Sequence, residues 1–203
     1  MPKISDEKRA ARRAQILEAA WLCFQKQGLQ ATTMDDIIRA SGLSAGAVYS
    51  YYPSKEELIV AAVTTSLIGL QERVEPILRS APPSPDLFVE KITQAISDFT
   101  TRESYDLKRI ALLGWSEAQR NERLRETIRG FYLAFRARLA DVAVSWCNAG
   151  LLRKSASTSD VAKVVLAEIL GFVVQSALLG DVEPRDMARG LQDLAAVEVD
   201  DGP

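Results

Sequence analysis

Helix start and stop signals divide the first 60 residues into short, closely spaced helices. Between residues 9 and 27, apolar side chains recur at the spacing of one helix face from Ile16 onward, and Gly28 ends the run. A second helix opens at Thr33, with Asp36 three residues later in the pattern of a capping box. These signals indicate short helices that follow one another closely along the chain.

The third and fourth helices follow without a long connection. Gly42 stops the second helix, Ser44 caps a third that ends at the Tyr-Tyr-Pro corner, and Ser54 opens a long helix toward Arg79. Three helices therefore occupy about fifty residues, with a glycine-containing turn between the second and third. This arrangement is the helix-turn-helix pattern.

The rest of the chain also has helical periodicity, after a proline-rich break at residues 81–86. The sequence predicts helices at 86–101, 105–119, 121–149, 159–180 and 185–196. We therefore predict an all-α fold with an N-terminal helix-turn-helix domain and a C-terminal helical domain. The expected domains are residues 1–54 and 55–197, followed by a disordered tail at 198–203.

Composition excludes several classes of function. The 203 residues contain no histidine, which removes the commonest general base and metal ligand, and no catalytic constellation replaces it. The two cysteines, Cys23 and Cys147, are expected to be reduced thiols in the core. Neither a long apolar run nor a signal peptide is evident. We expect a cytoplasmic protein without catalytic activity, metal, cofactor or membrane partner.

Charge is distributed unevenly along the chain. Residues 1–55 hold eight basic and five acidic side chains, a net charge of +3. Because the whole chain has a net charge of −2, the remaining residues carry −5. A basic head on an acidic body is typical of a module that binds a polyanion.

The segment "LSAGAVYSYYPSKE" has features of a DNA-binding surface. The turn residues have little side-chain bulk, so their backbone can approach a groove, and hydroxyl groups near them can hold phosphates. Lys55 opens a helix, where a cation opposes the helix dipole, and a bound phosphate would account for it. Tyr52 is expected in the core instead. The predicted DNA-binding residues are Thr33, Ser44, Ala45, Gly46, Ala47, Tyr49, Ser50, Tyr51 and Lys55.

The stretch "TTMDDIIRASGLSAGAVYSYYPSKEEL" resembles the DNA-binding domain of the TetR family of bacterial transcription regulators. The resemblance implies that Thr33, Tyr49 and Lys55 contact phosphates of double-stranded operator DNA. Ala45 and Tyr51 depart from the residues that many members carry, which affects the expected operator sequence.

The resemblance also implies that the remaining helices form a domain for dimerisation and for binding a small-molecule effector. The helix at 159–180 is apolar nearly all round, as expected for a helix between its own core and a homodimer partner. Glu168 and Gln175 on it need polar partners, which a ligand, the other subunit or arginines such as Arg136 or Arg138 would supply. The candidate pocket residues are Phe99, Trp115, Glu117, Phe131, Tyr132, Phe135, Phe172 and Gln175.

These observations predict a dimeric repressor that binds a palindromic operator and is released by a small, lipophilic effector. The alternative is a helical adaptor that uses the same helices to bind another protein. Salt dependence distinguishes the two, because binding to phosphates weakens steeply as ionic strength rises.

Overall fold

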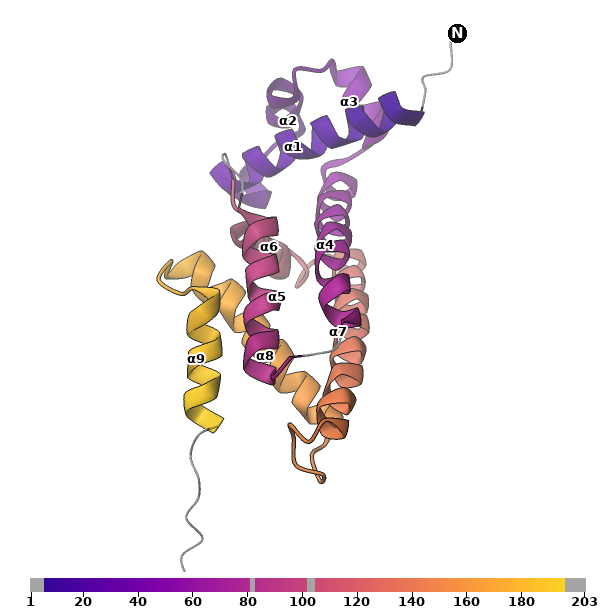
Figure 1. The fold of residues 1–203 in the computed structure, drawn as a ribbon. Helices are drawn as coiled ribbons and strands as arrows, with labels where there is room; N and C mark the ends of the chain where they lie inside the picture. The colour runs from indigo at the N-terminus through magenta and orange to yellow at the C-terminus, as the bar shows by residue number, and fades with distance from the viewer. Residues whose placement is uncertain (1–5, 81–82, 102–104, 196–203) are drawn as a thin grey trace, which may run out of the picture. The chain divides into compact units, whose positions relative to one another are not determined.

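The computed structural model describes residues 6–80, 83–101 and 105–195, and these residues form an all-helical fold (Figure 1). The predicted all-α class is confirmed, and each expected helix is present within a few residues of its expected bounds. The tail predicted at 198–203 lies outside the described residues. In chain order the helices are α1 (Asp6–Ala31), α2 (Met34–Ser41), α3 (Ala45–Tyr51), α4 (Lys55–Arg79), α5 (Pro85–Thr100), α6 (Leu107–Glu117), α7 (Glu122–Asn148), α8 (Thr158–Leu178) and α9 (Pro184–Ala195).

The helices group into two compact units. The first unit comprises residues 1–68 and 101–128, and the second comprises residues 69–100 and 129–203. Helices α4 and α7 each contribute residues to both units. The functional boundary predicted between residues 54 and 55 therefore falls inside the first unit, and it stays a prediction.

In the first unit, α1 packs against α2 and α6, and α2 packs against α3. Ile16, Ile37, Val48 and Leu58, one from each of the first four helices, are completely buried. Full burial of an aliphatic side chain contributes roughly 1.5–3 kcal/mol. The apolar periodicity of the sequence thus corresponds to one core that holds the helix-turn-helix together.

Two glycines set the turns between these helices. Gly28 has a φ of 80° and interrupts α1, and Gly42 has a φ of 66° where α2 ends. Both lie in the left-handed region that side chains with a Cβ atom disfavour. Thr32 donates its hydroxyl to the carbonyl of Gly28 over 2.7 Å and so closes the turn after the interruption.

In the second unit, α5 packs against α9 and α8. Trp146 of α7 is 1% exposed, meets Phe88 edge-on at a centroid distance of 5.3 Å, and donates its indole N–H to the carbonyl of Pro83 over 2.7 Å. This hydrogen bond ties α7 to the segment that precedes α5.

Among the described residues, α8 alone is long and apolar enough to cross a membrane by length and composition. Its apolar side chains divide between two faces. Val165, Ile169 and Phe172 are buried in the unit, whereas Val164 and Leu178 are 58% and 67% exposed. An apolar helix that is covered on one face only leaves the other face open to a partner.

Candidate nucleic-acid interface and effector groove

The start of α2 is a reciprocal capping box. The Asp36 backbone N–H donates to the Thr33 hydroxyl oxygen over 3.2 Å, and the Thr33 backbone N–H donates to the Asp36 carboxylate over 3.0 Å. The Thr33 hydroxyl itself donates to the same carboxylate over 2.7 Å. Thr33 is exposed. The predicted cap is confirmed, and it holds the Thr33 hydroxyl at the protein surface.

The cap also changes the acidity of Asp36. The hydrogen bond from the Thr33 hydroxyl, and then that from the Thr33 backbone N–H, lower the pKa of Asp36 from its ordinary value of 3.8. A carboxylate with a lowered pKa in the folded state stabilises the fold above its unfolded pKa, and this stability is lost as pH falls through the folded pKa.

We therefore expect the urea midpoint of unfolding to fall as the pH drops below about 4. In Asp36→Asn the urea midpoint should decrease less at low pH than in the unmodified protein, because the amide does not titrate. Asp35→Asn is the matched control, since Asp35 is exposed on the same turn. Identical pH profiles for the two variants would contradict the role of the capping carboxylate.

Helix α3 presents one buried face and one exposed face. Ser44 accepts a hydrogen bond from the Ala47 backbone N–H over 3.3 Å, as its predicted capping role requires. Val48 is fully buried, whereas Tyr49 is 44% exposed. A Cβ atom added to Gly46 would meet nothing within 4 Å, so packing inside this chain does not require a glycine there. The small residues at the start of α3 therefore form an open surface.

The three tyrosines after Val48 have different environments. Tyr52 is 4% exposed, and the guanidinium of Arg13 lies 5.6 Å from its ring centroid, so Tyr52 belongs to the core as predicted. Tyr51 is half-buried and Tyr49 is exposed. Ser50 is exposed and donates its hydroxyl to the carbonyl of Ala47 over 2.7 Å. The polar surface of α3 thus consists mainly of tyrosine and serine hydroxyls.

Lys55 has a structural role that the sequence did not indicate. Its ammonium group donates hydrogen bonds to the carbonyl oxygens of Leu29, Gln30 and Thr32 over 3.1, 3.0 and 3.0 Å. These carbonyls follow the glycine that interrupts α1, where a cation interacts favourably with the helix dipole. The position of Lys55 at the start of α4 is thus explained without a bound anion, and its contact with DNA stays a prediction.

A second long-range contact supports the same module. The Gln15 side-chain amide donates to the backbone carbonyl of Ser41 over 2.7 Å, and it joins α1 to the end of α2. Ser54 accepts a hydrogen bond from the Glu57 backbone N–H over 3.2 Å, as half of the expected box. The Glu57 side chain instead pairs with Arg123, so the reciprocal half is absent.

The predicted pocket residues lie in several places. Trp115 and Glu117 belong to the first unit, where Glu117 accepts a hydrogen bond from Gln30 over 2.6 Å. In the second unit, Phe172 is fully buried and Gln175 is exposed. Phe99 packs so closely on α4 that a Cβ atom at Gly69 would lie 2.8 Å from its ring.

A groove of about 410 Å³ lies in the second unit between α4 and α7. Of the predicted pocket residues, Phe131 and Phe135 line it. Their rings stack at a centroid distance of 6.2 Å, and Tyr132 meets Phe131 edge-on at 5.5 Å. The volume falls in the range of small-molecule sites, about 300–1,000 Å³.

Comparison with known proteins identifies the family. The profile described as "Bacterial regulatory proteins, tetR family" matches residues 16–62. The profile described as "BetI-type transcriptional repressor, C-terminal" matches residues 89–198, more than half of the chain. The chain belongs to the TetR family. The resemblance deduced from the sequence is confirmed: this TetR-family protein is a transcriptional regulator with a helix-turn-helix DNA-binding domain, and not an enzyme.

Individual relatives agree with this assignment. The uncharacterised HTH-type transcriptional regulator YfiR of Bacillus subtilis is 29% identical over 192 residues, which cover 92% of this chain and 90% of YfiR. A TetR transcription regulator from Haloarcula marismortui superimposes with a TM-score of 0.75 at 20% identity, over 92% of this chain and 97% of that one. A regulator from Saccharomonospora viridis, solved in complex with choline, superimposes with a TM-score of 0.74 at 19% identity. The match covers 93% of this chain and 97% of that one. These two likenesses show the shared fold.

Proposed function

We propose that this protein is a cytoplasmic repressor that binds a palindromic operator through α2 and α3 and is released by a small-molecule effector. The observation that carries the proposal is the exposed face of α3. Tyr49 and the small residues from Ser44 to Gly46 remain exposed, while Val48 and Tyr52 anchor the helix from behind. The proposed contacts are Thr33, Ser44, Ala45, Gly46, Ala47, Tyr49, Ser50, Tyr51 and Lys55.

The exposed face of α8 supports a dimer. Val164, Gly171 and Leu178 recur every seven residues, and Gln175 is exposed on the same face. A seven-residue repeat keeps one stripe of a helix toward a neighbouring helix. Pairing of two copies of α8 would cover these apolar residues and give the exposed amide of Gln175 a partner. It would also supply two DNA-binding modules for two half-sites.

Helix α4 supports regulation by an effector. It begins at Lys55, whose ammonium group holds the end of α1, and its last turns carry residues that line the groove of the second unit. A ligand that binds one state of the groove better shifts the protein toward that state. We propose that the preferred state holds the two DNA-binding modules at a spacing that no longer fits the operator.

Selection of bound duplexes from a random DNA library tests this function. We expect a palindromic consensus, with affinity that falls steeply as salt rises. On that duplex, Tyr49→Phe should weaken binding about tenfold with an unchanged salt slope, because it removes a hydrogen bond to a phosphate from a side chain that carries no charge. Tyr132→Phe in α7 is the matched control. If no duplex is enriched, the adaptor hypothesis replaces this one.

A further inference from the structure

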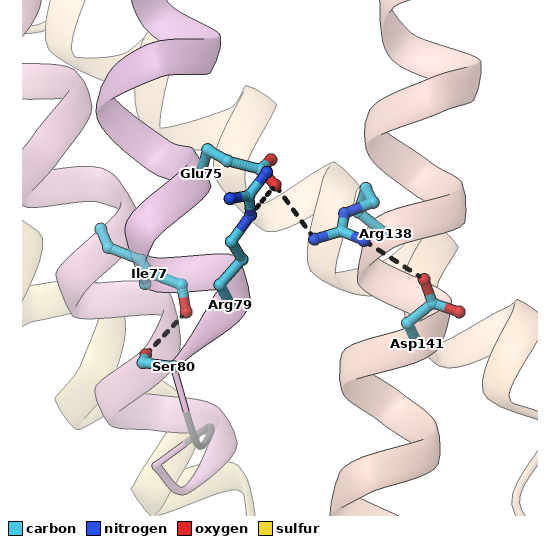
Figure 2. A network of polar contacts seen from close by, with 6 residues as sticks. All are labelled: Glu75, Ile77, Arg79, Ser80, Arg138 and Asp141. Carbon is cyan, nitrogen blue, oxygen red and sulfur yellow. Dashed lines mark hydrogen bonds and ion pairs between the residues drawn. The ribbon is translucent and has the colours of Figure 1, made fainter.

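Two arginines share one carboxylate at the rim of the groove between α4 and α7 (Figure 2). Arg79 Nε lies 2.7 Å from Glu75 Oε1, and an Arg138 guanidinium nitrogen lies 3.2 Å from the same oxygen. Glu75 and Arg79 come from α4 and Arg138 from α7. The single carboxylate oxygen thus brings two positive charges together from opposite walls.

The positive charge of this cluster is only partly balanced. Glu75, Arg79 and Arg138 are the charged residues that line the groove, which gives a net charge of +1. Asp141 lies 3.9 Å from Arg138 and its side chain is 75% exposed, so water screens this pair; the side chains of Arg79 and Arg138 are themselves 74% and 43% exposed, which leaves both accessible to an anion. Each guanidinium carries five N–H donors, and the contacts with Glu75 use few of them. The cluster therefore keeps donors for another anion.

The wall beside the arginines is apolar. Val74 and Leu78 of α4 face Phe131, Ala134 and Phe135 of α7 across the groove. Val74 and Leu78 are 2% and 8% exposed, so the accessible apolar surface of the groove comes mainly from Phe131, Ala134 and Phe135. The lining residues of α4 span about 12 Å from Gln71 to Arg79, and the apolar pair Val74 and Leu78 spans about 6 Å of it, at a rise of 1.5 Å per residue. This length suits a short hydrocarbon chain.

We infer that the groove binds an amphipathic anion, a small molecule with a carboxylate and an apolar tail. The carboxylate accepts charge-assisted hydrogen bonds from Arg79 and Arg138, which are stronger than hydrogen bonds between neutral groups. The tail lies along Val74, Leu78, Phe131 and Phe135. This inference rests on the proposed effector function and specifies the chemical class of the effector.

The charges of the groove select against a cationic ligand. A quaternary ammonium group, such as that of choline, is bound by aromatic rings and carboxylates. Here Glu75 is already paired with both arginines, so an added cation would meet repulsion from Arg79 and Arg138. A neutral alcohol with the same tail would gain the apolar contacts but not the ionic hydrogen bonds.

Calorimetric titration of the full chain with three probes that carry straight hydrocarbon chains of similar length tests the inference. Decanoate, decanol and decyltrimethylammonium have similar tails and differ in charge. The two ionic probes are used below their micelle-forming concentrations and decanol below its solubility limit. We expect decanoate to bind at least tenfold more tightly than the other two. Equal binding of the three probes, or preference for the ammonium, would overturn the inference.

Three variants assign the binding to the cluster. Arg138→Gln should weaken decanoate binding about tenfold, and Arg73→Gln, an exposed arginine of α4 outside the groove lining, should leave it unchanged. Glu75→Gln should strengthen decanoate binding, because the competing carboxylate is gone while the shape is kept. If Glu75→Gln weakens binding, or Arg138→Gln has no effect in a folded variant, the cluster is not the anion site.

Operator binding is measured separately on the selected duplex. If the protein binds the operator but does not bind decanoate, and decanoate does not release the operator, the anion site is refuted and the DNA-binding function is kept. Decanoate binding without any selected operator would refute the proposed function and leave the anion site standing.

Discussion

Replacing Lys55 by methionine is expected to lower the free energy of unfolding by about 2 kcal/mol. Methionine keeps the apolar stem of the lysine but removes the ammonium group, which donates to the carbonyls of Leu29, Gln30 and Thr32. Three hydrogen bonds from one charged group are lost together. The expected loss of about 2 kcal/mol is that of a single hydrogen bond to a charged group, because water can hydrate the part-exposed carbonyls once the ammonium is gone. Urea unfolding followed by circular dichroism measures the change.

Lys26→Met is the matched control for this experiment. Lys26 is an exposed lysine of α1, so its replacement should change the free energy of unfolding by less than about 0.5 kcal/mol. If Lys55→Met unfolds at the same urea concentration as the unmodified protein, the three hydrogen bonds do not stabilise the module.

The salt dependence of operator binding separates the structural role of Lys55 from a direct contact with phosphate. Loss of one phosphate contact should reduce the slope of log affinity against log salt by about 0.9. Displacement of the end of α1 and the turn before α2, without loss of a phosphate contact, should reduce affinity and leave the slope unchanged. The structural role is also measured on its own, because the free energy of unfolding is determined without DNA.

The sequence predicted the parts of the fold that depend on neighbours along the chain. The capping box of Thr33 and Asp36, the cap at Ser44 and the turn at Gly42 are local signals, and each is present in the structure. The burial of Val48 and Tyr52 followed from their four-residue spacing. Helix periodicity and capping are fixed by side chains three or four positions apart, so a sequence displays them directly.

The sequence did not predict contacts between distant segments. Lys55 reaches carbonyls 23 to 26 residues away, and any residue type can present a backbone carbonyl, so no pattern marks it. Arg138 and Glu75 are 63 residues apart, and their pairing depends on how α4 and α7 pack. Phe131 and Phe135 were candidates because aromatic side chains are visible in the sequence, whereas the pairing of Arg79 and Arg138 with Glu75 was not predicted; Arg138 was considered only as a partner of Glu168 or Gln175.

Replacing Trp146 by alanine is expected to lower the free energy of unfolding by about 4 kcal/mol, the largest effect considered. The side chain is 1% exposed, its ring meets Phe88, and its indole N–H is bonded to Pro83. Truncation leaves a large cavity and an unpaired carbonyl in the second unit. Trp146→Phe keeps much of the volume, so it should cost about 2 kcal/mol, partly through the lost hydrogen bond.

Trp21, which is half-buried, provides a comparison for the hydrogen bond of Trp146. The indole N–H of Trp21 is buried and has no hydrogen-bond partner among the described residues, although its ring lies 5.7 Å from that of Tyr105. Trp21→Phe therefore removes similar volume without breaking a hydrogen bond, and it relieves an unsatisfied donor. We expect this variant to cost less than about 1 kcal/mol. If Trp146→Phe and Trp21→Phe shift the urea midpoint equally, the bond to Pro83 adds nothing, and packing alone holds Trp146 in place.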